Sequence, residues 1–211
     1  MFKTKNISKE VTFASSLNIP FQRWYPYIEG YSPNFVLNII NQYCPNPTLV
    51  YEPFAGTGTT LFAADSIGCD CAYSEINPLL RYIIETKLRI LSLEIGIRSN
   101  LAQQLQVLSD HIIQDLSACA PSQDLSINYQ QAFGLSKYFY DDTYDKILRL
   151  RTLIDNIATN DADLANLLTI AVLSTLVPTS LLKKQGDVRY KTEKELKAMP
   201  NFDEFLRERI N

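Results

Sequence analysis

Apolar and polar positions divide the chain into two parts with different periodicities. In the first part, two short apolar runs at residues 48–52 and 69–74 have the length and composition of buried β-strands. In the second part, from about residue 95 onward, apolar positions recur with helical spacing. The stretch 161–177 is apolar on nearly all sides, which predicts a buried helix. We find no strand pattern after residue 75 and therefore expect the second part to be helical.

Helix signals lie between the two predicted strands and on either side of them. A first helix is predicted after Ser32, a preferred N-cap residue that is followed by a proline. A second is predicted over 60–67 and ends at Gly68, and a third covers about 78–93. Strand, turn, helix, strand and helix at this spacing form the beginning of a parallel α/β sheet.

The predicted sheet is unfinished. A parallel sheet of two strands with apolar faces is not stable by itself, so the missing strands must come from elsewhere. We therefore divide the chain into an α/β part, residues 1–94, and a helical part, residues 95–211, which we expect to contact a partner chain or a nucleic acid.

Composition indicates a soluble globular protein. Hydrophobic residues make up 46% of the chain, charged residues 20%, and the net charge is −3. This charge does not favour a nucleic-acid binder, although a cleft made by two chains can still be locally positive. Residues 1–10 lack a signal-peptide pattern, and the longest apolar stretch, 164–177, is too short to span a bilayer. We expect a cytoplasmic protein with no membrane segment.

The cysteines give no sign of a metal site. Cys44, Cys69, Cys71 and Cys119 form no CxxC pair, and His111 is the only histidine. The ligand sets and spacings of zinc sites are therefore missing, and we expect no metal. Isolated cysteines in a chain of this length are typical of reduced, cytosolic proteins.

The strongest local signal is the sequence EPFAGTGTT at residues 52–60. Gly56 and Gly58 allow the backbone to bend sharply and to approach a ligand closely, and the following helix presents free N–H groups. A Walker loop would need a lysine after its last glycine, and a dinucleotide fingerprint would need glycine or alanine where this chain has Leu61. These residues disfavour a phosphate site. A plain strand–helix turn remains the alternative.

An acidic residue follows the second predicted strand. Glu75 lies 17 residues after Gly58 and across the crevice of the sheet from the glycine loop. A carboxylate there can accept hydrogen bonds from both hydroxyls of a ribose, and Ile76 would flank an adenine face. The alternative is an ordinary carboxylate at the end of a strand.

These segments resemble the amino-group DNA methyltransferases. Residues 52–60 are similar to motif I of that family, commonly DPFxGSGTT, with Glu52 in place of the more usual aspartate. Residues 75–78 resemble the acidic motif II, and residues 23–32 resemble motif X, which lies beside the methionine end of the cofactor. The resemblance covers about residues 20–95. It implies a Rossmann-like methyltransferase fold, here with a partial parallel sheet and a large helical region, that binds S-adenosylmethionine.

The resemblance also implies which residues hold this cofactor. Phe54 and the glycine loop would bind it, Glu75 would hold the ribose, and Tyr31 or Ser32 would lie near the methionine carboxylate. The full set of implied cofactor-binding residues is Tyr31, Ser32, Glu52, Phe54, Ala55, Gly56, Thr57, Gly58, Thr59, Thr60, Glu75, Ile76 and Asn77.

The catalytic motif of that family is absent from the sequence. Amino methyltransferases hold the flipped base in an Asp/Asn/Ser-Pro-Pro-aromatic loop, and this chain contains no Pro-Pro pair. It contains no Pro-Cys of the cytosine-C5 type either, so we assign no catalytic residue. Residues 178–191 resemble a basic segment that precedes the SPPY loop in certain amino methyltransferases. The candidates for contacts with DNA phosphates, unless they form a solvated face, are Lys183, Lys184, Arg189 and Lys191.

These observations favour one subunit of a split DNA methyltransferase of restriction–modification type. A second chain would supply the SPPY or NPPY loop and the remaining strands, and the substrate would be double-stranded DNA. The expected target is N4 of cytosine first and N6 of adenine second. Two alternatives stay open, which are a non-catalytic scaffold or specificity subunit and a methyltransferase acting on RNA or a small molecule.

Overall fold

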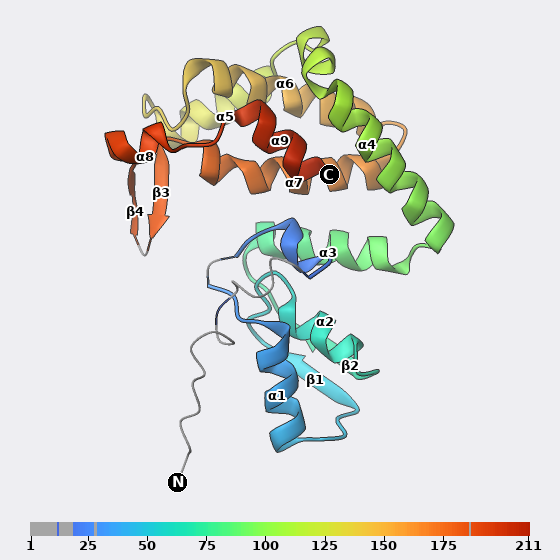
Figure 1. Ribbon diagram of the computed structural model, residues 1–211. Coiled ribbons are helices and arrows are strands. Elements are labelled where there is room, and N and C mark those ends of the chain that lie inside the picture. The colour runs from blue at the N-terminus through green and yellow to red at the C-terminus, as the bar shows by residue number, and fades with distance from the viewer. Residues whose placement is uncertain (1–11, 13–18, 28, 186) are drawn as a thin grey trace. The chain divides into compact units, whose positions relative to one another are not determined.

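The chain folds as two compact units (Figure 1). Each unit has a hydrophobic core of its own. The computed structural model describes residues 12, 19–27, 29–185 and 187–211. The two units are residues 1–91 and 92–211. Helices make up 63% of the structure, and a small parallel sheet lies in the first unit. The predicted mixed α/β class is therefore confirmed, and the architecture is compatible with a partial Rossmann-like fold.

The first unit contains the α/β elements in the predicted order. They are η2 (Gln22–Trp24), α1 (Pro33–Tyr43), β1 (Leu49–Glu52), α2 (Thr59–Asp65), β2 (Asp70–Tyr73) and α3 (Pro78–Ser92). Ser32 caps α1 as expected, because its Oγ accepts the N–H of Phe35 at 3.1 Å. Gly68 has a left-handed φ of 70° and closes the turn after α2.

The strands β1 and β2 lie parallel and are connected through α2, as the sequence predicted. Their register places Glu52 beside Tyr73 at the carboxyl ends of the two strands. The loops that follow both strands therefore start from the same edge, where the N–H of Ala55 donates to the carbonyl of Ser74 at 3.1 Å. This edge is where open α/β sheets hold their ligands.

One face of strand β1 is exposed to solvent. Leu49 and Tyr51 are 62% and 60% exposed, whereas Val50 packs against the core formed by α1 and α2. Within the residues that the structure describes, the only partner strand of β1 is β2. Large apolar side chains on the face of a parallel sheet are normally buried by a layer of helices, and the described residues do not cover Leu49 and Tyr51 in this way.

The second unit is mainly helical and surrounds α7. Its elements are α4 (Ile95–Ala118), α5 (Gln123–Phe133), α6 (Asp141–Ala158), α7 (Ala162–Thr179), β3 (Leu182–Gln185), β4 (Asp187–Tyr190), α8 (Glu193–Lys197) and α9 (Phe202–Ile210). α7 packs against α4, α6 and α9, and Leu168 in its centre has no exposed surface. The prediction of a buried helix at 161–177 is confirmed.

One feature of this unit, the β3–β4 hairpin, differs from the sequence-based expectation. The strands β3 and β4 form an antiparallel hairpin with Lys183 beside Arg189, so the prediction of no strand after residue 75 is wrong. Every residue of β4 is exposed, and its side chains are mostly polar, so neither apolar alternation nor an apolar run marks it as a strand. Helix α5 lies in the part that was expected to be helical, although no side chain in it is buried.

The expectation that the apolar stretch 164–177 is too short to span a bilayer is wrong on length alone, because helix α7 is long and apolar enough to cross a membrane by length and composition. More than half of it is buried within the structure, where it contributes Leu168, Ala171 and Val172 to the core. A core helix of a soluble protein has the same features, and the packing of α7 agrees with that description.

Candidate cofactor-binding site

The glycine loop between β1 and α2 depends on two left-handed residues. Gly56 has a φ of 56° and Gly58 a φ of 92°, a region that residues with a Cβ rarely adopt. A Cβ on Gly58 would also lie 2.8 Å from the ring of Phe62 in α2 and 3.3 Å from Ile84 in α3. Glycine is therefore required at 58 by conformation and by space, and the loop backbone lies directly on the core of this unit.

A hydrogen-bonded cluster holds the start of the loop. The Glu52 carboxylate accepts the N–H of Phe54 at 2.9 Å and the hydroxyls of Tyr31 and Thr60, both at 2.8 Å. Burial raises the pKa of Glu52, but these three donors outweigh burial and hold the pKa below its usual value. Burial and the adjacent carboxylate raise the pKa of Tyr31 to about 12. Tyr31 is therefore a neutral donor, and Glu52 a fixed acceptor, at physiological pH.

Glu75 ties the two loops together. One carboxylate oxygen accepts the N–H of Gly56 at 2.7 Å, and the other accepts the N–H of Asn77 at 2.8 Å. Each carboxylate oxygen can accept a second hydrogen bond, so capacity remains for hydroxyls of a ligand. Asn77 in turn accepts the N–H of Leu79 through its Oδ1 at 3.0 Å and caps the start of α3.

A pocket of about 300 Å³ lies at this edge of the sheet, and it is lined by Pro53, Phe54, Ser74, Glu75 and Ile76. Phe54 is 84% exposed and Ile76 is 99% exposed. Two large uncovered apolar side chains therefore stand beside a carboxylate that can accept hydrogen bonds. This combination suits a ligand with a flat apolar ring attached to a polyhydroxylated group.

The structure brings only part of the predicted cofactor set into this pocket. Phe54, Glu75 and Ile76 line it, and residues 55–58 form the adjoining loop. Tyr31 and Ser32 are not among the lining residues, since the Tyr31 hydroxyl binds Glu52 and the nearly fully buried Ser32 caps α1. Their roles toward a ligand stay predictions.

Lys87 is a site residue that the sequence reasoning missed. Its side chain has no exposed surface, and its Nζ donates to the carbonyl of Thr57 at 2.9 Å. Burial lowers the pKa of Lys87 to about 7. A signal was available, because Lys87 occupies an apolar-face position of α3 defined by the buried residues Leu80, Ile83 and Ile84.

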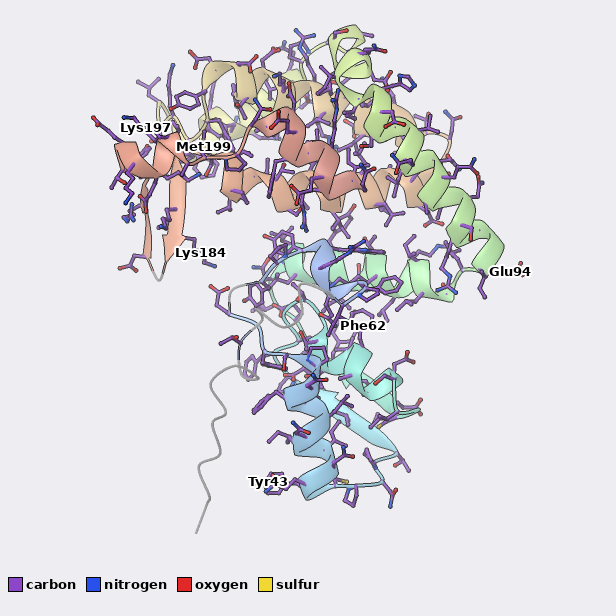
Figure 2. The ribbon with its side chains drawn as sticks, in the orientation of Figure 1. Tyr43, Phe62, Glu94, Lys184, Lys197 and Met199 are labelled. Carbon is purple, nitrogen blue, oxygen red and sulfur yellow. The ribbon has the colours of Figure 1, made fainter. Side chains whose placement is uncertain are left out.

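The predicted DNA-contacting residues lie on or beside the β3–β4 hairpin. Lys183 and Arg189 both form ion pairs with Glu195, at 2.5 and 2.8 Å. Hydrogen bonds from Arg189 first, and then from Lys183, hold the pKa of Glu195 well below its usual value. Lys191 donates to two backbone carbonyls, and Lys184 is exposed (Figure 2). Much of the local positive charge is therefore engaged within the unit, and contact with DNA stays a prediction.

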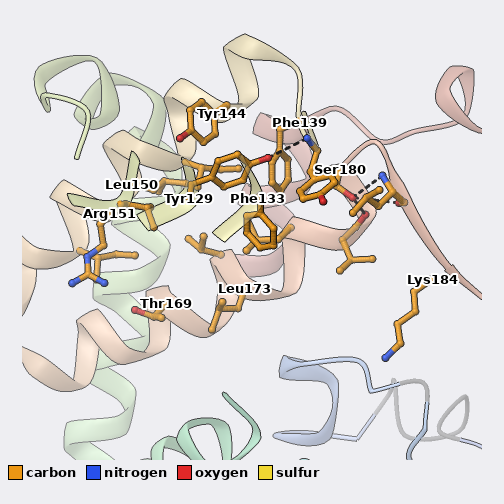
Figure 3. A pocket seen from close by; sticks show the side chains of 18 of the residues that line it. Tyr129, Phe133, Phe139, Tyr144, Leu150, Arg151, Thr169, Leu173, Ser180 and Lys184 are labelled. Carbon is orange, nitrogen blue, oxygen red and sulfur yellow. Dashed lines mark hydrogen bonds between the residues drawn. The ribbon is translucent and has the colours of Figure 1, made fainter. Parts of the chain in front are cut away.

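A second pocket, of about 510 Å³, lies within the helical unit between α5, α6, α7 and the hairpin (Figure 3). Its lining is mainly aromatic and aliphatic, with Tyr129, Phe133 and Phe139 on one side and Leu173 on another. The hydroxyl of Tyr129 donates to the carbonyl of Ser136 at 3.0 Å. Apart from Lys184, none of the predicted site residues lines this pocket.

Comparison with known proteins gives a partial match. The chain is 34% identical over 80 residues to two curated proteins named Type II methyltransferase M.AvaI, from Nostoc sp. (strain PCC 7120 / SAG 25.82 / UTEX 2576) and Anabaena variabilis. Part of this chain is homologous to a methyltransferase. The match covers 37% of this chain and 17% of each relative. No family profile matches the chain, and no solved structure matches it.

Proposed function

We propose that this chain is the S-adenosylmethionine-binding subunit of a split, site-specific DNA methyltransferase of restriction–modification type. One observation carries the proposal. The loop with left-handed glycines 56 and 58 follows β1 and is tied to Glu75, which follows β2, in a chain with partial homology to Type II methyltransferases. On this basis we also propose that the protein acts in the cytoplasm.

The residues at this edge fit the cofactor. Phe54 and Ile76 offer uncovered apolar surface for the adenine ring, and Glu75 offers acceptors for the ribose hydroxyls. Within the described part of the chain, the buried Oγ1 of Thr57 has no hydrogen-bond partner. The bound cofactor would supply an electrophilic methyl group. The chain's own contribution would be to hold and orient that donor.

We further propose that a second methyltransferase chain completes the site. It would carry the SPPY or NPPY loop that receives the flipped base, since this sequence has no Pro-Pro pair. The exposed face of β1, with Leu49 and Tyr51, would be covered by a layer of that partner. Double-stranded DNA would be the substrate, with cytosine N4 as the first expected target and adenine N6 as the second. Lys184 and the rest of the basic hairpin would contact phosphates.

Calorimetric titration with S-adenosylmethionine tests the cofactor assignment. We expect the wild-type chain to bind and Gly58→Ala to bind at least about tenfold more weakly, because the added Cβ meets Phe62 and strains the loop. Gly96→Ala is the matched control, since a Cβ there meets nothing within 4 Å. Binding by the Gly58 variant equal to wild type would contradict the assignment of the loop.

Radiolabelled methyl transfer to duplex DNA tests the split arrangement. The chain alone should give no transfer, and transfer should appear when it is combined with the SPPY- or NPPY-containing product of a neighbouring gene. Robust transfer by the lone chain would refute the split arrangement. The absence of this motif from the sequence also favours a second candidate, a non-catalytic scaffold with a methyltransferase-like fold. That candidate predicts no binding of S-adenosylmethionine at all.

A further inference from the structure

Lys87 lies against the glycine loop from the side of the protein core. Its side chain has no exposed surface, and its Nζ lies 2.9 Å from the carbonyl oxygen of Thr57 and 5.5 Å from the centroid of the Phe62 ring. Among the described residues, no carboxylate forms an ion pair with it. The charge of this lysine is therefore directed at one peptide of the loop and at one aromatic face.

Burying the amino group of a lysine at this position costs free energy of folding. The neighbouring buried positions of α3 are Leu80, Ile83 and Ile84, and an apolar residue of similar length would fill the space of Lys87 without burying an amino group. Replacing an unpaired buried charge by an apolar residue is commonly neutral or stabilising for a fold. Stability alone thus gives no reason for a lysine, whereas its bond to Thr57 does.

That bond fixes the orientation of the peptide between Thr57 and Gly58. In a trans peptide the C=O and the N–H point in opposite directions, so holding the Thr57 carbonyl also sets the direction of the Gly58 N–H. This N–H donates to the carbonyl of Ala55 at 2.8 Å and closes the turn of the loop. Because Gly58 has a left-handed φ and no side chain, this peptide can otherwise rotate easily.

The same ring connects Lys87 to the glycine. Phe62 lies under the ammonium and also limits the space at Gly58, where an added Cβ would be 2.8 Å away. On the other side of the loop, Glu75 accepts the N–H of Gly56. The loop is therefore held from two sides, by a carboxylate on its ligand edge and by an amino group on its core edge.

We propose that Lys87 is a positioning residue, which fixes the 57–58 peptide and so preforms the loop that receives the cofactor. The link to a cofactor rests on the proposed function, but the effect of Lys87 on the loop does not. Lys87 does not contact the pocket lined by Phe54, Glu75 and Ile76, and it acts through the backbone of Thr57.

The test compares three variants of the full chain. Lys87→Met keeps the length and removes the donor, Lys87→Arg keeps a donor, and Arg81→Met removes one positive charge from the exposed side of the same helix. Hydrogen–deuterium exchange of residues 55–59 measures the loop without any ligand. Calorimetry with S-adenosylmethionine measures binding, and urea unfolding measures stability.

We expect Lys87→Met to raise loop exchange and to weaken binding, each by about tenfold, the effect of losing one hydrogen bond to a charged group. Its stability should not fall, and Lys87→Arg should restore both properties to within about threefold of wild type. Arg81→Met should match wild type. Exchange and binding of Lys87→Met equal to wild type would overturn the proposal, as would a loss of binding that only follows a loss of stability.

Two further outcomes are separable. If wild-type protein binds no S-adenosylmethionine, the proposed function fails, and the exchange data alone still decide whether Lys87 holds the loop. If Lys87→Met does not fold, hydrogen exchange of the wild-type chain tests the proposal instead. The Gly58 N–H should then be protected from exchange as strongly as the interior amides of α2, and an unprotected Gly58 would overturn the proposal.

Discussion

The buried amino group of Lys87 makes a specific prediction about stability and pH. Burial lowers the pKa of Lys87 from 10.5 to about 7 in the folded protein. Between these two pH values the unfolded chain binds a proton that the folded chain does not, so the free energy of unfolding rises with pH. Below about pH 7 both states are protonated and the full penalty applies. This lowering of the pKa corresponds to roughly 5 kcal/mol.

Lys87→Met removes this penalty and also removes the donor to the Thr57 carbonyl. An unsatisfied buried carbonyl costs about 1–3 kcal/mol, so the variant should gain about 2–4 kcal/mol at pH 6 to 7. The gain should shrink by up to about 1.4 kcal/mol for each pH unit above 7, as the wild-type penalty disappears. Near pH 10 the variant should be no more stable than wild type.

The fluorescence of the single tryptophan can measure this difference in unfolding free energy in the unit that contains Lys87. Trp24 lies in η2 of the first unit, so its fluorescence reports on the unit that contains Lys87. Urea unfolding at pH 6, 7, 8 and 9 would be compared between wild type and Lys87→Met, with Arg81→Met as the control for loss of one charge. A stability difference that does not change with pH, or that matches the control, would refute the description of Lys87 as a desolvated amine.

Three further predictions concern other parts of the molecule. Tyr31→Phe removes the hydroxyl that binds Glu52 and Thr60 and should lower the free energy of unfolding by about 1–3 kcal/mol, whereas Tyr43→Phe, at an exposed position, should change it little. Tyr51→Lys should weaken association with the proposed partner chain by at least about tenfold in a pull-down titration, and Leu135→Lys should not. Lys184→Ala should reduce the salt dependence of DNA binding by the combined chains, and Glu195→Gln should increase it by releasing Lys183 and Arg189.

Elements that bury an apolar face were the ones that the sequence predicted. β1, α2 and β2 were predicted because glycines and apolar runs mark their ends, and the buried helix α7 was predicted because it is apolar on nearly all sides. The β3–β4 hairpin was missed because its residues are mostly polar or exposed, so its formation depends on local turns and on contacts with neighbouring elements. Periodicity detects an element only when one of its faces enters a core.

The same limit applies to the candidate site. Spacing along the chain placed Glu75 near the glycine loop, and the structure shows it bonded to Gly56. Spacing did not show that Glu195 engages Lys183 and Arg189, because a sequence gives the charges but not their pairing. Nor did it identify Lys87, since its role depends on the direction of one side chain beneath the loop.

Different residues around the loop hold different parts of its backbone. Glu52, Tyr31 and Thr60 fix its beginning, and Lys87 fixes its middle from the core side. Glu75 bonds to the backbone and still has acceptor capacity toward the pocket. Glu52, Tyr31, Thr60 and Lys87 are thus committed to backbone or to one another before any ligand arrives. A loop held in this way loses little conformational entropy on binding, which favours a site that receives a flexible cofactor in one orientation.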